Sequence, residues 1–277
     1  MTDVKQRLLS AVEARQSELF DLLSALVRID SQNFGSSGRE AAAADFLARE
    51  LRALGLSPDV YSPMSVPGLP ENPDYWGGRH LEDRFNVTAC VPGRGAKRLM
   101  LAAHSDTVPV GDPALWSFDP FSGEQRDGRI LGRGACDDKY GIAAALFLMR
   151  LLRDEGVVLP YELCFTAYCD EEFGGSNGAL AACLKYPSDD IANLDCKSFD
   201  VWAVASGGGS ICFHIRSDTP RDSCGGMLEG LFVLRDELYA MKEARRTELS
   251  RVPLYRDTVI PDTAVRFMEL RSGDGST

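Results

Sequence analysis

The fold is decided by one short stretch of sequence, Leu99-Met100-Leu101-Ala102-Ala103-His104-Ser105-Asp106-Thr107-Val108-Pro109. Its five leading residues are apolar and predict a buried strand, and His104 and Asp106 follow where that strand ends. Residues two apart in a strand face the same side, so Asp106 can hydrogen-bond the imidazole of His104 while the other ring nitrogen meets a metal ion. The stretch therefore predicts a functional site at the end of a buried strand.

Two acidic clusters follow this stretch along the chain. The first is Gly132-Arg133-Gly134-Ala135-Cys136-Asp137-Asp138-Lys139, and the second is Asp170-Glu171-Glu172-Phe173-Gly174-Gly175, which closes the apolar run from Tyr161 to Tyr168. Each cluster alone is typical of a solvated turn. In open α/β sheets, however, ligands bind at the carboxyl ends of the strands. The three segments together predict a metal-dependent hydrolase.

The order of the expected elements indicates the fold class. Helical periodicity runs over 3–28 and 38–54, strands are expected at 86–91, 98–103 and 161–168, and helices at 141–152 and 176–184. This alternation favours an α/β fold with an open, mostly parallel sheet covered by helices. We predict a catalytic, metal-binding domain over residues 1–205.

The pattern changes beyond about residue 195. Strands are expected at 199–205, 210–216 and 259–270, and a long helix at 226–246, whose recurring apolar residues indicate a packing face. We predict that residues 206–277 form part of a second, α+β domain.

Composition excludes several classes of function. The net charge of −11 argues against nucleic-acid binding. No apolar run approaches the roughly 20 residues that span a membrane, and no signal pattern opens the chain, so a cytoplasmic protein is expected. The eight cysteines stand singly; most are predicted to be buried thiols, in keeping with a reducing compartment. Cys136 has no obvious histidine partner for a nucleophilic role.

With the three segments in this order, the chain resembles the metallopeptidase 20 family. That family includes aminoacylase, acetylornithine deacetylase, succinyl-diaminopimelate desuccinylase and glutamate carboxypeptidase. The resemblance rests on the segments 104–109, 132–139 and 170–175, supported by Trp116-Ser117-Phe118-Asp119-Pro120-Phe121 and Asp127-Gly128-Arg129-Ile130. It is good over residues 13–185 and weaker as far as Arg271.

The resemblance implies a zinc-exopeptidase-like catalytic domain and a role for each candidate residue. His104 would bind one metal ion and Asp106 would orient His104, Asp137 would bridge two ions, and Glu172 would bind the second. Glu171 would be the general base. Two zinc ions are implied, and cobalt or manganese also suits mixed imidazole and carboxylate ligands.

Three departures from the family pattern bear on this expectation. A further acidic ligand, expected near the end of the next strand, would fall at Ser206, and Arg221 stands where the lid domain usually carries a histidine. The late histidine that completes the second metal site is missing before Thr277. The resemblance therefore implies an incomplete catalytic domain and a partial lid and dimerisation domain, apparently truncated at the C-terminus.

These observations predict a zinc-dependent metallopeptidase or amidohydrolase of the deacylase or dipeptidase type. It would cleave an amide bond of N-acyl amino acids or short peptides with a metal-activated water. The expected partners are that substrate and either a second copy in a homodimer or a complementing C-terminal fragment. The alternative is an inactive or split remnant that acts as a binding module.

Overall fold

The computed structural model describes residues 2–174, 177–195, 213, 224–253, 255–263 and 265. The chain divides into two compact units, Met1–Val201 and Trp202–Thr277. The candidate site residues predicted as metal ligands or as the base all belong to the first unit.

Three helices open the first unit, α1 (Thr2–Ala14), α2 (Gln16–Val27) and α3 (Ala41–Ala53). The helical pattern predicted over 3–28 is interrupted at Arg15, whose guanidinium pairs with Glu18 and Asp154. Leu22, Leu26 and Val27 on α2 are buried, as their spacing predicts.

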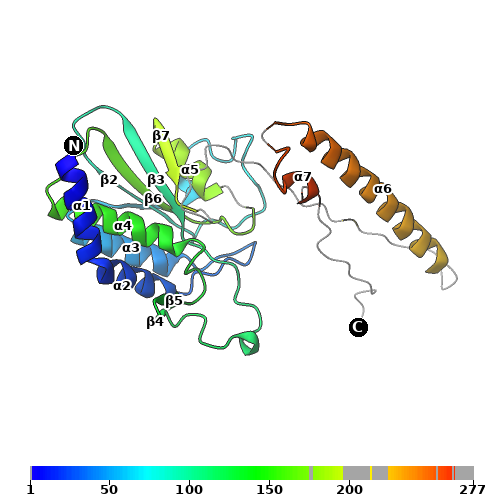
Figure 1. Cartoon of the computed structure of the whole chain (residues 1–277), viewed down its shortest axis with the longest axis horizontal. Helices are drawn as coiled ribbons and strands as arrows, with labels where there is room; N and C mark the ends of the chain where they lie inside the picture. The colour runs from blue at the N-terminus through cyan, green and yellow to red at the C-terminus, as the bar shows by residue number, and fades with distance from the viewer. Residues whose placement is uncertain are drawn as a thin grey trace. The chain divides into compact units, whose positions relative to one another are not determined.

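A five-stranded sheet forms the centre of this unit (Figure 1). Its spatial order is β1 (Asp59–Tyr61), β2 (Asn86–Val91), β6 (Glu162–Tyr168), β3 (Arg98–His104) and β7 (Asp190–Asn193). Strands β6, β3 and β7 run parallel, whereas β2 pairs antiparallel with both β1 and β6. The predicted α/β fold class is confirmed, with the parallel strands at the part of the sheet that carries the site.

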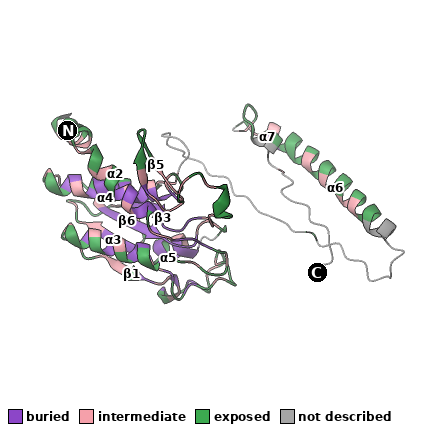
Figure 2. Cartoon of the chain, turned by 90° about the horizontal axis from the view of Figure 1, so that it is seen from below, coloured by how far each residue is buried: buried purple, intermediate pink, exposed green. Residues whose placement is uncertain are grey.

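Helices cover both faces of the sheet. Helix α4 (Lys139–Asp154) packs with α2 and α3 on one face, where Leu101, Phe165 and Ala167 enter the main core. Helix α5 (Asn177–Lys185) lies on the other face, where Asn86 on β2 donates to the carbonyl of Gly178. Figure 2 shows the buried strands and the buried side of α4 between exposed helix surfaces.

The first turn of α4 comes very close to the sheet. A Cβ on Gly141 would lie 2.6 Å from Oδ1 of Asp138 and 2.9 Å from Cβ of Leu194. Only glycine fits this approach without a shift of its neighbours. It allows the loop that precedes α4 to lie against the ends of the parallel strands.

Short elements complete the first unit. Strands β4 (Glu124–Arg126) and β5 (Arg129–Leu131) form a hairpin whose turn residues, Asp127 and Gly128, both have positive φ. Single 3₁₀ turns occur at η1 (Pro63–Ser65) and η2 (Pro113–Leu115).

The second unit contains α6 (Cys224–Ser250) and α7 (Ile260–Thr263). Helix α6 confirms the helix predicted at 226–246. The strand predicted at 259–270 is wrong at 260–263, because these residues form a helical turn; residues 266–270 lie outside the described part. The strands predicted at 199–205 and 210–216 also lie outside it, apart from Phe213. Among the described helices, none is long and apolar enough to cross a membrane.

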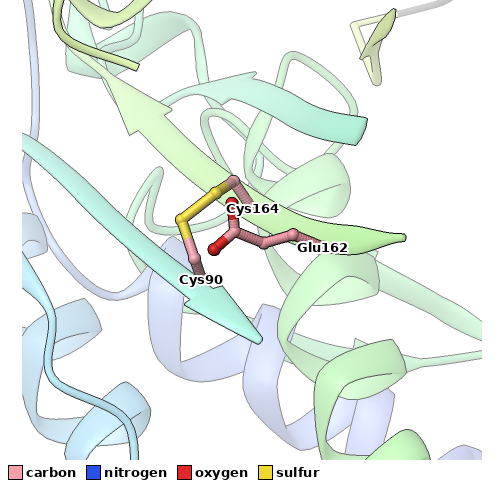
Figure 3. A group of neighbouring side chains, drawn as sticks. All are labelled: Cys90, Glu162 and Cys164. Carbon is pink, nitrogen blue, oxygen red and sulfur yellow. A yellow bond between two sulfur atoms is a disulfide. The ribbon is translucent and has the colours of Figure 1, made fainter. Parts of the chain in front are cut away.

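The described cysteines differ from the expected buried thiols both in pairing and in burial. Cys90 on β2 and Cys164 on β6 stand directly opposite one another and form a disulfide, so the prediction of free thiols is wrong for these two (Figure 3). The antiparallel register, which the sequence does not reveal, brings them together. Cys169 is a buried free thiol as predicted, whereas Cys136 and Cys183 are free but exposed.

Candidate metal centre

The candidate site lies where the three parallel strands end. His104 is the last residue of β3 and stands opposite Tyr168, the last residue of β6. The acidic cluster Asp170 to Glu172 follows β6, and Asp195 follows β7 by two residues. Asp137 and Asp138, joined by a cis peptide bond, come directly before α4. The topology thus brings four separate segments to one edge of the sheet.

The side chains of these segments meet around His104. Its Nε2 lies 2.8 Å from Oδ1 of Asp137 and 3.9 Å from Oε2 of Glu171. His104, Asp137 and Glu172 each offer a ligand atom within 4.8 Å of the others, and His104, Glu171 and Asp195 form a second such group. The residues that the family resemblance implies as ligands or base are therefore all present in this cluster.

Asp106 contacts His104 in a different way from the one predicted. The Nδ1 of His104 lies 2.9 Å from the backbone carbonyl oxygen of Asp106 and 3.6 Å from the Oδ1 of its carboxylate. Asp106 therefore contacts the imidazole at Nδ1, as predicted, but the hydrogen bond is to its backbone carbonyl and not to its carboxylate. A carbonyl acceptor at Nδ1 leaves Nε2 facing the acidic groups as a potential metal ligand.

The carboxylate of Asp106 instead binds the turn after β6. Its Oδ2 accepts the backbone N–H of Glu171 at 2.9 Å and of Glu172 at 3.1 Å, and the side-chain amide of Asn33 at 2.7 Å. Asp106 is fully buried. Although burial opposes ionisation, His104 and these hydrogen bonds lower the pKa of Asp106, since they favour the charged form.

A buried ionic network holds the turn after β6 in place. Arg84, fully buried, pairs with Glu40 and with Asp170, and its Nη2 lies 3.9 Å from Oδ2 of Asp106. Asp170 also pairs with Arg79 and has a positive φ of 65°. Such a backbone conformation is costly for a residue other than glycine and persists only where its surroundings hold it. No local sequence pattern indicates this network, because its charged residues are scattered over loops and a helix start.

The loop before α4 is fixed by a buried lysine. The Nζ of Lys139 donates to the carbonyls of Leu26 at 3.1 Å and Ile29 at 2.7 Å, at the C-terminal end of α2. Burial lowers the pKa of Lys139 to about 8. Lys139 therefore joins the Asp137 loop to the N-terminal helices.

The electrostatics of the cluster suit a cation. Burial raises the pKa of Glu172 to about 7, with the charge of Asp137 adding to the effect, and burial also raises the pKa of Asp138 to about 7. Burial opposes protonation of His104, yet Asp106, Asp137 and Asp138 raise its pKa to about 11. The carboxylates thus stabilise positive charge at His104.

The donor set of the cluster also fits a metal ion. A buried atom, Oδ1 of Asp138, has no hydrogen-bond partner among the described residues. Imidazole and carboxylates are ligands that suit zinc, cobalt or manganese. The residues present are therefore compatible with the metal ions that the sequence predicts.

Asp195 is the residue that sequence reasoning missed. It lies after a four-residue strand, Asp190 to Asn193, which pairs with β3 but is mostly exposed. The sequence pattern predicts the next strand later in the chain, at 199–205, and the family resemblance implies the acidic ligand at Ser206. Ser206 lies outside the described residues, as do Arg221 and the predicted lid segment around it. In the sequence, Asp195 could have been noticed only as an aspartate about two dozen residues beyond the Glu171-Glu172 pair.

The fold and the cluster together define an α/β protein with a candidate di-metal centre at its parallel strand ends. Comparison with known proteins agrees with this class. Residues 100–210 match the model of Peptidase family M20/M25/M40. The resemblance predicted from the sequence is thereby confirmed, and the chain matches the M20 family over its central segments.

Individual proteins of known sequence are similar to this chain over part of its length. A succinyl-diaminopimelate desuccinylase of Methylocella silvestris is 38% identical over 141 residues, which are 50% of this chain and 32% of that enzyme. An N-formyl-4-amino-5-aminomethyl-2-methylpyrimidine deformylase of Bacillus subtilis is 28% identical over 181 residues, 65% of this chain and 39% of that enzyme.

A solved structure supports the fold. Human carnosine dipeptidase 1 superposes with a TM-score of 0.53 at 19% identity, over 71% of this chain and 41% of that protein. This likeness shows a common fold. The matched part of this chain covers well under half the length of each of these three relatives.

Proposed function

We propose that this protein is a metal-dependent hydrolase that cleaves an amide bond of an N-acyl amino acid or short peptide. The observation that carries the proposal is the meeting of His104, Asp137, Glu171, Glu172 and Asp195 at one edge of the sheet. The family match over residues 100–210 supports it.

The proposed ligands divide between two ions. As the resemblance implies, His104 would bind one ion, Asp137 would bridge the two and Glu172 would bind the second. Asp195, whose ligand atom lies within 4.8 Å of that of His104, would add to the first. When bound, the ions would polarise the amide carbonyl and lower the pKa of a coordinated water. Asp195 would supply the acidic ligand that the family resemblance implies at Ser206. We propose zinc because imidazole and carboxylate ligands suit it and it is the common hydrolytic metal.

Glu171 is the proposed general base, as the resemblance implies. Its backbone N–H is held by Asp106, and its side chain remains partly exposed, with access to solvent. Burial raises its pKa, with the charge of His104 opposing and that of Asp106 adding to the shift. A carboxylate with a raised pKa takes a proton from the attacking water more readily and returns it to the departing amine nitrogen.

The substrate class follows from what the relatives' names have in common. A desuccinylase, a deformylase and a dipeptidase all act on a carbonyl carbon bonded to nitrogen. We therefore propose an N-acyl or peptide amide. The alternative of an inactive remnant is not favoured by these relatives. The homodimer, the complementing fragment and the cytoplasmic location remain predictions from the sequence.

Metal loading and turnover test this function. The purified chain is loaded with zinc, its metal content is measured by elemental analysis, and it is assayed with N-succinyl, N-formyl and N-acetyl amino acids and with dipeptides. We expect about two zinc ions per chain and release of a free amine from at least one substrate. Two bound ions without turnover of any substrate would favour the binding-module alternative.

The Glu171→Gln variant separates the base from the ligands. It should keep the metal content and lose about 10²- to 10⁴-fold in rate. Glu71→Gln, at an exposed position, is the matched control and should change neither. Retained turnover in Glu171→Gln would refute the role assigned to Glu171.

A further inference from the structure

A second group of potential metal ligands lies away from the candidate active site. Cys90 on β2 stands opposite Cys164 on β6, and Glu162 precedes Cys164 by two residues, so that the three side chains share one face of the sheet (Figure 3). One ligand atom from each lies within 4.8 Å of the others. The proposed hydrolytic function uses none of these residues.

The register of the strands separates this group from His104. Cys164 stands opposite Met100, and Tyr168 stands opposite His104. The two positions are four residues apart along parallel strands, roughly 13 Å at the rise of an extended chain. An ion held by Cys90 and Cys164 would therefore occupy a separate site.

The donor set selects a particular kind of ion. Two sulfur ligands favour soft or borderline cations such as zinc, cobalt or cadmium over magnesium or calcium. The candidate active site, by contrast, offers nitrogen and oxygen. Thiolate coordination therefore gives a signature that the other site would not produce.

The surroundings balance the charge of such an ion. Two thiolates and Glu162 carry three negative charges, and a divalent cation supplies two positive ones. Arg98 supplies the third, because its Nε lies 2.5 Å from Oε2 of Glu162. The side chains of Arg98 and Glu162 are about 30% exposed, which leaves the ion a route from solvent.

In the structure the two sulfurs are joined, so the site would exist only after reduction. Cys90 is half-buried and Cys164 fully buried. A dithiol reductant would therefore attack Sγ of Cys90 and release Cys164 as a thiol. Its second thiol would then displace Cys90 and close the reductant's own disulfide. Metal binding would release the two thiol protons.

We infer that Cys90, Cys164 and Glu162 form a redox-gated site, which holds a thiophilic divalent cation when the cysteines are reduced and none when they are paired. In both states β2 and β6 are cross-linked, by a disulfide in one and by an ion in the other. This inference is independent of the proposed hydrolase function.

Titration with cobalt alone tests it. The full chain is reduced with dithiothreitol, freed of reductant without air, and titrated with Co²⁺ while the near-ultraviolet thiolate-to-cobalt absorption is followed. We expect the band to appear in the reduced protein and to be absent from the oxidised protein. A thiol assay should show the two thiols of Cys90 and Cys164 after reduction, since the disulfide found among the described residues has opened.

Variants assign the band to these residues. Cys90→Ser, at the half-buried position, should abolish it, and Glu162→Gln should weaken cobalt binding by about 10- to 100-fold. Cys183→Ser and Cys136→Ser remove exposed free thiols and should leave the band unchanged. A band that survives in Cys90→Ser, or the absence of a band from reduced wild-type protein, would overturn the inference.

Discussion

Asp106 and Glu171, 65 residues apart, are joined by a hydrogen bond of 2.9 Å from the backbone N–H of Glu171 to Oδ2 of Asp106. Asp106 follows β3 and Glu171 follows β6, so the bond fixes one strand end against the other. The carbonyl of Asp106 meanwhile faces His104. One buried residue thereby sets the positions of a candidate ligand and of the candidate base.

The Asp106→Asn variant tests this double role. It removes the negative charge that accepts the N–H groups of Glu171 and Glu172, and in either orientation its amide nitrogen would face the N–H of Glu171. We expect metal affinity to fall by about 10- to 100-fold, as for other groups that support ligands. Equilibrium dialysis with zinc measures this, and exposed Asp74→Asn is the control. Unchanged affinity in a folded Asp106→Asn protein would contradict the assignment.

Arg84 is predicted to stabilise the fold by neutralising buried carboxylates. Arg84→Met leaves Glu40 and Asp170 without this partner and should cost roughly 3–5 kcal/mol of unfolding free energy. The double variant with Glu40→Met removes both partners of one ion pair, so its loss should be smaller than the sum of the two single losses. Urea denaturation measures all three. Strict additivity would show that the pair does not act as a unit.

Asp195 is predicted to bind a metal ion. Asp195→Asn should lower zinc affinity at one of the two sites by at least about 10-fold, which a two-phase binding isotherm would show. Asp190→Asn, at the exposed start of β7, is the matched control in the strand that precedes Asp195. Identical isotherms for Asp195→Asn and the wild type would rule out Asp195 as a ligand.

The stability of the metal-free protein should fall as pH rises from about 5 to 7.5. Burial raises the pKa of Glu40, Asp138 and Glu172 to about 7 each, from ordinary carboxyl values. A carboxyl whose pKa is raised on folding favours the folded state while protonated, and this contribution is lost as pH rises through the folded pKa. His104, with a pKa raised to about 11, acts in the same direction above about 6.5.

Thermal unfolding with a chelator measures this dependence, and added zinc should reduce it, since the ion replaces the lost protons. A melting temperature of the metal-free protein that rises between about pH 5 and 7.5 would contradict this prediction. It would show that the buried carboxyl groups do not destabilise the fold when they lose their protons.

Much of the fold could be predicted because strongly apolar segments dominate it. Strands β3 and β6 and helix α4 lie where their apolar patterns predict, and the polar residues that close them form the candidate site. Strand β7 was missed because it is short and mostly exposed, and it exists through its pairing with β3.

The ionic network was also beyond sequence reasoning. Glu82, Asp83 and Arg84 form a charged run typical of a solvated loop, yet Arg84 is fully buried while its two neighbours are exposed. Which member of such a run turns inward depends on the distant carboxylates of Glu40 and Asp170, and no local pattern identifies them. The Cys90–Cys164 pairing depends in the same way on a register set by the whole sheet.

The ammonium of Lys139 has a wider consequence for the molecule. Its two acceptors, the carbonyls of Leu26 and Ile29, belong to the opening helical segment, more than a hundred residues earlier in the chain. Residues 2–29 therefore help to hold the Asp137 loop in place. Proteolysis, or a binding partner, that separated these residues from Lys139 would leave its buried ammonium without its two acceptors, beside the Asp137 loop. The first residues of the chain would thereby affect the chemistry of the candidate metal ligands.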